Sequence, residues 1–312
     1  MIQRVTIDPE QFSVDKVAIA LSAEQTHYLT RVLRLKAGDR FIAQDGTGSQ
    51  WLAAIAQQSQ QANVIEKLSA AEQPPANLRL IAALTKGNSF DAVVRQATEL
   101  GITHLHPVIT ARTILKPSAN KITRWKRIAQ EASEQSERVT VPEILAPVTF
   151  QTSLAHIEQA CLEQTYIRPD SVKLDSVKPD SLKLDSTKQN SVEQNSVEQN
   201  SIKADSAQPQ PSLRFICAAR ANQQKTENNS PILKSNYLLS RLLFHQQTLP
   251  SSASLPSITI AIGPEGGWTT EEITVATTYN YEVVSLGPAI LRAVTAPITA
   301  LSLVTAAREL LI

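Results

Sequence analysis

Two loops rich in glycine and proline are the parts of this sequence best suited to bind a ligand. The first, residues 263–267, follows an apolar run and precedes a segment with threonine caps and early acids. That order predicts a buried strand, a tight loop and a helix. The second loop, residues 286–292, follows the next apolar run and also carries a Gly-Pro pair.

The first loop holds three of the chain's nine glycines within five residues. A tight connection without any ligand is the alternative for this loop alone. Since ligands bind outside the carboxyl ends of the strands in open α/β sheets, the two loops together predict one site. No GxGxxG, GxxxxGK[ST], HExxH or GxSxG motif occurs, so the sequence does not support dinucleotide, P-loop, zinc-protease or hydrolase chemistry. Cys161 and Cys217 form no CxxC pair and are expected to be packing residues rather than metal or disulfide partners.

Two domains must position these loops. Short strands are predicted at residues 4–7, 17–20, 41–44, 51–56 and 64–68, with one helix near 24–35 and a hairpin across 41–56. A proline-containing linker follows at residues 73–75. From Leu78, strands and helices alternate, which predicts a parallel sheet covered by helices. The expected strands are 78–84, 102–109, 213–219, 258–263 and 282–287, and the expected helices are 89–100, 118–137, one from Thr270 and 297–311.

Bulk composition excludes some classes. The chain has 312 residues, of which 42% are hydrophobic, and no apolar run approaches a membrane span of roughly 18 residues. The amino terminus has no apolar signal core, so we expect a cytoplasmic protein with no membrane partner.

Positive charge is concentrated although the net charge is only +1. Two basic stretches fit a phosphate-binding face, and a solvated helix surface is the alternative. The candidate RNA contacts are His27, Arg31, Arg34 and Lys36 in the first stretch and Arg112, Lys116 and Arg124 in the second.

A pentapeptide repeat interrupts the second domain. An Asp/Asn-Ser pair recurs every five residues from Asp170 to Ser206. A β-solenoid would need about three stacked units or more, which this segment is too short to form. We therefore predict a disordered insertion at about residues 165–210.

Several motifs together resemble one family. GPEGGW at 263–268 and LGPAILRAVTAPITAL at 286–301 resemble the ribosomal RNA small subunit methyltransferase E family of the SPOUT superfamily. HYLTRVLRLKAGD at 27–39 resembles its N-terminal PUA-like barrel, and QATELG at 96–101 resembles the start of its catalytic domain. The resemblance covers the chain except about residues 150–211.

The resemblance implies a PUA-like RNA-binding β-barrel at residues 1–72 and, at 76–312, a SPOUT-type α/β domain with a C-terminal trefoil knot. It implies a homodimer whose site draws on both subunits. It also implies S-adenosylmethionine as cofactor and N3 of one uridine in the decoding region of 16S rRNA, in the small ribosomal subunit, as target. The implied cofactor contacts are Ala219, Ile262, Gly263, Gly266, Gly267, Leu286, Gly287, Ile290, Leu291, Arg292 and Thr295.

This chemistry needs no metal, because a sulfonium methyl donor already carries its leaving group. The uracil N3 proton must leave, so the site needs a base or a cation that stabilises the uracil anion. Arg138 and Arg292 are the candidate cations, since a guanidinium fits a carbonyl oxygen well. Glu131 is the candidate base, and an exposed helix acid is the alternative. Val294 stands where family members commonly have Glu, so any base must lie elsewhere.

Three alternatives stay open. Val294 is compatible with an RNA-binding protein that has lost catalysis. A knotted methyltransferase acting on transfer RNA is the second, and an unrelated α/β nucleotide-binding protein is the third.

Overall fold

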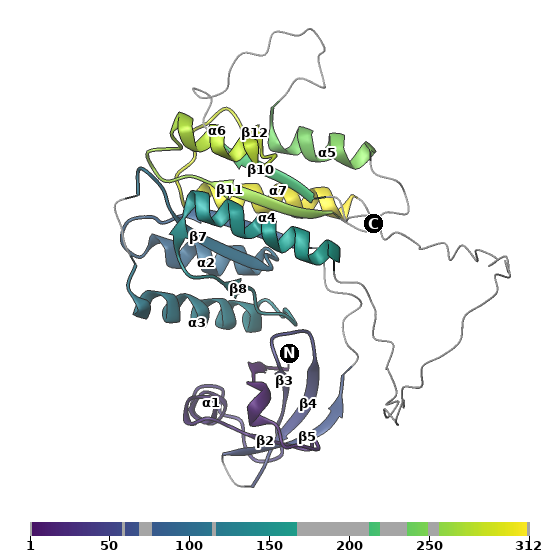
Figure 1. The fold of residues 1–312 in the computed structure, drawn as a ribbon. Coiled ribbons are helices and arrows are strands. Elements are labelled where there is room, and N and C mark those ends of the chain that lie inside the picture. Colours follow the sequence, from purple (N-terminus) through teal and green to yellow (C-terminus); the bar gives the residue numbers. More distant parts are fainter. Residues whose placement is uncertain are drawn as a thin grey trace, which may run out of the picture.

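The chain forms two β-sheets that are stacked end to end in Figure 1. A computed structural model of the protein describes residues 2–57, 60–68, 77–113, 117–166, 212–218, 236–248 and 256–310. The linker at 73–75, the repeat at 170–206, and two site candidates, Lys116 and Ala219, lie outside these ranges. No helix in the described ranges is both long and apolar enough to cross a membrane.

The N-terminal sheet has five strands in the order β1-β3-β4-β5-β2. They are β1 (Arg4–Thr6), β2 (Ala18–Ala20), β3 (Arg40–Gln44), β4 (Gln50–Ile55) and β5 (Gln61–Lys67). Burial alternates along β4 because one face of the strand meets the core and the other does not. The expected hairpin is confirmed as β3 and β4, which pair antiparallel. The expected helix near 24–35 is instead α1 (Ala23–His27) followed by a π-helical turn, η2 (Tyr28–Val32).

The second sheet is parallel, as the alternation of strands and helices predicts. Its order is β12-β10-β11-β6-β7-β8, and β9 (Val148–Thr149) pairs with the far end of β7. The strands are β6 (Leu78–Ala83), β7 (His104–Ile109), β8 (Glu143–Ile144), β10 (Ser212–Cys217), β11 (Ser257–Ile262) and β12 (Glu282–Val284). Both β6 and β11 are buried along their full length, as expected for central strands covered on both faces. An α/β fold is therefore confirmed.

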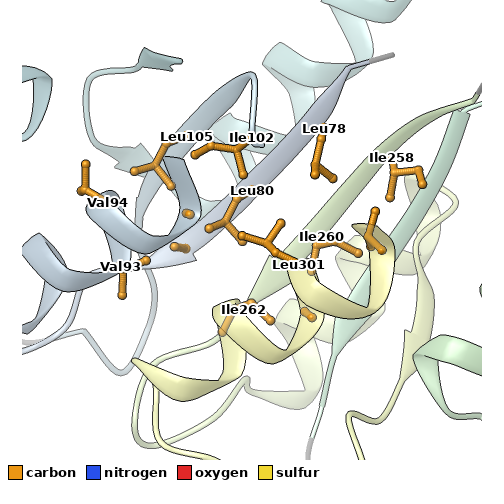
Figure 2. Packing of buried hydrophobic residues seen from close by; sticks show 14 of the residues in the cluster. Leu78, Leu80, Val93, Val94, Ile102, Leu105, Ile258, Ile260, Ile262 and Leu301 are labelled. Carbon is orange, nitrogen blue, oxygen red and sulfur yellow. The ribbon is translucent and has the colours of Figure 1, made fainter. Parts of the chain in front are cut away.

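Helices cover both faces of this sheet. On one face lie α2 (Ser89–Glu99), α3 (Ala119–Gln135), α5 (Leu238–Thr248) and α7 (Thr295–Glu309). Figure 2 shows Leu301 of α7 packed among Leu80 of β6 and Ile260 of β11. On the other face lie α4 (Phe150–Tyr166) and α6 (Thr270–Thr278). The elements α4, α5, β8 and β9 are not predicted from the sequence, whereas the other α-helices begin within two residues of their expected positions.

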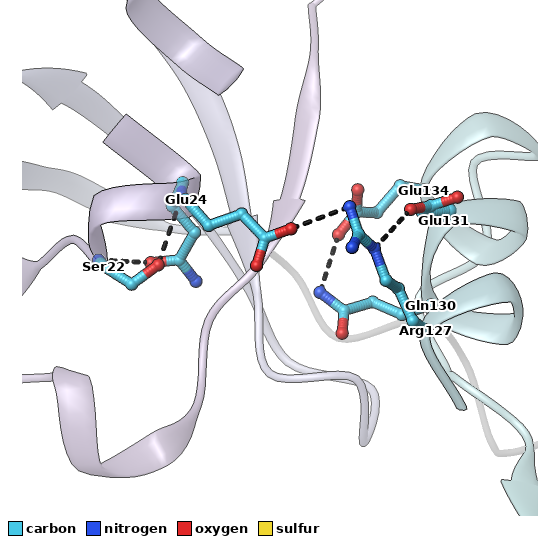
Figure 3. Close-up of polar contacts among 7 residues, drawn as sticks. Ser22, Glu24, Arg127, Gln130, Glu131 and Glu134 are labelled. Carbon is cyan, nitrogen blue, oxygen red and sulfur yellow. Dashed lines mark hydrogen bonds and ion pairs between the residues drawn. The ribbon is translucent and has the colours of Figure 1, made fainter. Parts of the chain in front are cut away.

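The N-terminal sheet docks on α3, which in Figure 1 is the nearest of the helices that cover the second sheet. The Thr6 amide donates to Glu134 Oε1 at 2.8 Å, and Arg4 pairs with Glu137 at 2.9 Å. Figure 3 shows Arg127 of α3 reaching Glu24 across the junction, at 2.8 Å. Backbone bonding joins the parts as well, because the Val141 amide donates to Gly46 O at 2.8 Å.

Candidate functional site

The two glycine-proline loops meet around a cavity of about 340 Å³ at the carboxyl ends of β10, β11 and β12. This is the edge of a parallel sheet where ligands bind in open α/β folds. Its volume lies at the lower end of the range for small-molecule sites, about 300–1,000 Å³. Eight expected cofactor residues line it: Ile262, Gly263, Gly266, Gly267, Leu286, Gly287, Ile290 and Leu291. Arg292 and Thr295 lie in the segment that follows but do not line the cavity; cofactor binding by all of these residues stays a prediction.

The first loop is built around a tryptophan. Trp268 is 2% exposed, its indole Nε1 donates to Cys217 O at 3.1 Å, and its ring lies 4.3 Å from that of Phe150. A Cβ on Gly263 would come within 3.1 Å of the indole. Glycine therefore suits this position, because it leaves room for the tryptophan ring. A capping box then starts α6, in which Thr269 and Glu272 each accept the other's backbone N–H.

Arg112 reaches this loop from the connection after β7. Its guanidinium donates to the carbonyl oxygen of Gly266 and lies 3.5 Å from that of Trp268. The neighbouring Ala111 amide donates to Glu272 Oε1 at 2.9 Å. Arg112 was expected to contact RNA, and the structure places it in the cavity lining. Sequence reasoning missed this place because 154 residues separate Arg112 from Gly266 and no local pattern joins them.

The second loop is more open. Gly287 has φ +140°, which L side chains rarely adopt, and no atom of the residues that the structure describes lies within 4 Å of where its Cβ would be. Ile290 is 87% exposed at the mouth of the cavity. The carbonyl oxygen of Arg292 accepts from the Thr295 and Ala296 amides, both at 2.9 Å, and these bonds begin α7. The Val294 side chain is partly buried against the core, so an apolar residue suits that position.

Neither Arg138 nor Glu131 lines the cavity. Arg138 donates to the carbonyl oxygens of Thr98 and Ile102 near the end of α2, and burial lowers the pKa of its guanidinium. Glu131 accepts from Arg127 Nε at 2.9 Å, on the side of α3 that meets the N-terminal sheet.

If the helix expected at 118–137 continued to Arg138, then Glu131, Gln135 and Arg138 would share one helix face. It does not continue, because α3 ends at Gln135 and Glu137 then takes φ +60°. Arg138 therefore lies beyond the helix, where its side chain caps α2. Of the three catalytic candidates, Arg292 is the one whose chain neighbours, Leu291 and Ala293, line the cavity.

The RNA-contact candidates occupy two surfaces. Arg31, Arg34 and Lys36 are exposed on the N-terminal part, and His27 lines the groove between that part and α3. Arg124 lies on α3, where its Nε donates to Asp91 Oδ2 at 2.8 Å. An exposed arginine that keeps an acidic partner still presents donors to a phosphate, so RNA binding at both surfaces stays a prediction.

Comparisons with known proteins agree with this architecture. A family model described as RNA methyltransferase domain matches residues 72–197 and 187–305. A second model, described as RNA methyltransferase PUA domain, matches residues 21–66. The α/β sheet, its cavity and these matches together define the class as an RNA methyltransferase.

Curated relatives narrow the class. A ribosomal RNA small subunit methyltransferase E of Synechocystis sp. is 34% identical over 310 residues, which cover 99% of this chain and 79% of the relative. Its counterpart in Rickettsia conorii is 30% identical over 96% of this chain and 93% of its own length. The chain belongs to the ribosomal RNA small subunit methyltransferase E family.

A solved structure supports the same fold. The Neisseria gonorrhoeae ribosomal RNA small subunit methyltransferase E, solved bound to S-adenosyl methionine, superposes with a TM-score of 0.63. The sequences are 21% identical, and the match covers 97% of this chain and 96% of that one.

Proposed function

We propose that the protein transfers a methyl group from S-adenosylmethionine to N3 of a specific uridine in 16S rRNA of the small ribosomal subunit. The observation that carries the proposal is the meeting of both glycine-proline loops at one cavity, in a chain of this family. Methylation of transfer RNA and RNA binding without catalysis are the competing functions.

The cavity residues fit S-adenosylmethionine in chemical type. Apolar side chains of Ile262, Leu286 and Leu291 suit the adenine ring, and the backbone of both loops offers polar groups beside them. Glu265 also lines the cavity and brings a carboxylate to a site that must receive a cationic ligand. When bound, S-adenosylmethionine supplies an activated methyl group on a sulfonium.

Catalysis then rests on alignment and on the uracil N3 proton. Arg292 is the candidate cation beside the cavity, where a guanidinium would stabilise the negative charge that develops on a uracil oxygen. Val294 cannot accept a proton. Arg138 and Glu131 stay candidates through the proposed homodimer, in which the site draws on residues from both subunits.

The proposal includes the finer architecture. We assign residues 1–72 to a PUA-like RNA-binding barrel and residues 76–312 to a SPOUT domain with a trefoil knot. Strand β11 supports the knot, because it comes late in the chain and yet lies between β6 and β10.

Light scattering tests the proposed homodimer, and a mass equal to one chain would contradict it. The enzyme would act in the cytoplasm on the small subunit.

The decisive experiment is mass spectrometry of modified nucleosides in 16S rRNA from cells that lack this protein. We expect 3-methyluridine to disappear and to return with the wild-type gene, but only weakly with Arg292→Ala. Arg95→Ala, a change at an exposed arginine of α2, is the matched control and should restore the modification fully. Persistence of 3-methyluridine in the deletion strain would refute the proposal, and loss from transfer RNA instead would favour the first competitor.

Kinetics of the purified protein separate the other catalytic candidates. If Glu131 is the base, Glu131→Gln should lower kcat about 10²–10⁴-fold while cofactor affinity stays intact. If Arg138 only caps α2, Arg138→Lys should lower the melting temperature and leave kcat unchanged. Calorimetry with S-adenosylmethionine excludes the non-catalytic function if the wild-type protein binds.

A further inference from the structure

Arg112 and the loop after β11 come from segments far apart in the sequence, yet they contact each other through charge and packing. The guanidinium donates to the Gly266 carbonyl oxygen, a charge-assisted bond that is stronger than one between neutral groups. The aliphatic part of the same side chain lies against the Gly266 backbone. A Cβ at Gly266 would lie 3.1 Å from Arg112 Cδ and 3.4 Å from its Cβ.

The segment that carries Arg112 is itself fixed. The Thr110 amide donates to Thr113 Oγ1 at 3.1 Å, and the Thr113 amide donates back to Thr110 O at 3.1 Å. The Ala111 amide is bound to Glu272, which also takes part in the capping box of α6. The guanidinium therefore extends from an ordered turn, and the cost in side-chain entropy of holding it on the loop is reduced.

Gly266 has no conformational need to be glycine. Its φ lies outside the left-handed range, unlike that of Gly267 at +71°. The three nearest atoms to its missing Cβ all belong to the side chain of Arg112. The absence of a side chain at Gly266 thus serves Arg112 and not a backbone turn.

We propose that Arg112 is a positioning residue that holds the first loop as a fixed wall of the cofactor cavity, and that Gly266 is glycine to admit the Arg112 side chain. The inference rests on the proposed function for what the cavity binds, but the contact between the two residues does not depend on it. A wall that is set before binding lowers the ordering cost of ligand association and keeps the donor aligned for transfer.

A double-mutant cycle tests the coupling. Calorimetry would measure S-adenosylmethionine affinity for the wild type, Gly266→Ala, Arg112→Ala and the double variant. We expect Arg112→Ala to weaken binding roughly ten- to hundredfold, the worth of a lost hydrogen bond to a charged group. Gly266→Ala should weaken binding in the wild type but add nothing once Arg112 is removed. Equal effects of Gly266→Ala in both backgrounds would overturn the proposal.

Arg112→Lys sharpens the cycle, because lysine keeps the aliphatic stem and loses the planar guanidinium. In the Arg112→Lys background, Gly266→Ala should remain harmful, since the stem still occupies the place of the Cβ. Arg95→Ala, at an exposed arginine far along α2, is the control for loss of positive charge and should leave affinity unchanged.

A second readout needs no ligand and separates this proposal from the proposed function. The chain has three tryptophans, so 5-fluorotryptophan labelling gives three ¹⁹F signals, and Trp268→Phe assigns the one from the loop. Arg112→Ala should shift or broaden the Trp268 signal and leave those of Trp51 and Trp125 in place. An unaltered Trp268 signal would overturn the proposal that Arg112 holds the first loop. If Arg112→Ala changes the Trp268 signal but the wild-type protein binds no S-adenosylmethionine, the positioning role of Arg112 is upheld. The proposed function is then refuted.

Discussion

The two loops that border the cavity have similar sequences and opposite structures. In the first, residues 263–268, the loop's own Trp268 lies against Gly263 and Arg112 lies against Gly266, and Trp268 is 2% exposed. In the second, residues 286–291, no described atom lies within 4 Å of the place a Gly287 Cβ would take, and Ile290 is 87% exposed. One wall of the cavity is therefore held by side-chain contacts within the protein, while the other exposes apolar surface at the cavity.

The helices that follow the loops explain part of this difference. Thr269 caps α6 through a capping box, which fixes the direction in which the first loop must enter the helix. Val294 occupies the N-cap of α7 and makes no side-chain cap bond. The second loop therefore lacks a side-chain cap at its end, and near its start Ser285 Oγ bonds the backbone of Gly287.

We call the first loop, residues 263–268, the held loop and the second, residues 286–291, the open loop. The largest expected effect comes from removing Trp268, the buried side chain of the held loop. Trp268→Ala should cost about 3–5 kcal/mol of stability, as for other buried aromatic truncations, and should also abolish S-adenosylmethionine binding. Trp125→Ala is the matched control, because Trp125 is 1% exposed but lies on the opposite face of the sheet. Trp125→Ala should lower the free energy of unfolding by a similar amount and leave the affinity for S-adenosylmethionine unchanged. Urea unfolding measures the stability of each variant, and calorimetry measures its affinity for S-adenosylmethionine. Equal affinities of the two variants would contradict the idea that the first loop is the rigid wall of the cavity.

A bulky side chain should affect the held loop more than the open one. Gly266→Val is expected to reduce S-adenosylmethionine affinity at least about a hundredfold, because Val must displace Arg112. A Cβ at Gly287 has no neighbour within 4 Å among the described residues, so Gly287→Val should lower the free energy of unfolding by only the roughly 1–3 kcal/mol of a strained backbone position. Melting curves and binding isotherms distinguish the two. A greater loss of affinity for Gly287→Val would reverse our assignment of the rigid wall.

Acid should destabilise the fold through His106, a buried histidine of β7. His106 lies on the sheet face under α4, and burial, followed by the charges of His104, Arg79 and His156, lowers its pKa to about 3. In the unfolded chain it titrates near its ordinary value of 6.5. Between about pH 6.5 and pH 3 the unfolded state therefore carries a proton on His106 that the folded state does not. Stability falls as the pH drops through this range.

At pH 5 this one group should cost about 2 kcal/mol relative to pH 7. His106→Leu removes the titration, so its urea midpoint should fall less between pH 7 and pH 5 than that of the wild type. An identical fall in the two proteins would show that other groups carry the acid sensitivity.

The sequence predicted most of this architecture because its signals were local. Apolar runs, the threonine cap of α6 at Thr269 and the two Gly-Pro loops sufficed to order the central strands and to bring both loops to one edge. The short strand β8 and the helix α5 were missed, since a two-residue strand has no periodicity and α5 has no strong polar face.

The candidate site was predicted less completely for a different reason. Its loop residues follow from local glycine and proline patterns, but the position of Arg112 depends on a contact across 154 residues. Arg138 was misplaced because the helical period was extended past the positive φ of Glu137. A residue that accepts φ > 0 without being glycine gives only a weak sequence signal.

The smallest expected effect concerns the open loop itself. Because Ile290 is 87% exposed, Ile290→Ser should change stability by less than about 0.5 kcal/mol, the usual range for surface substitutions. If a ligand covers the side chain, however, the same change removes apolar contact only in the complex, and affinity should fall a few-fold. Val14→Ser is the matched control, since Val14 is fully exposed and lies in the N-terminal part. Calorimetry with S-adenosylmethionine decides: equal affinities of the two variants would mean that the cofactor leaves Ile290 uncovered, and the surface would then be free for the RNA or a second subunit.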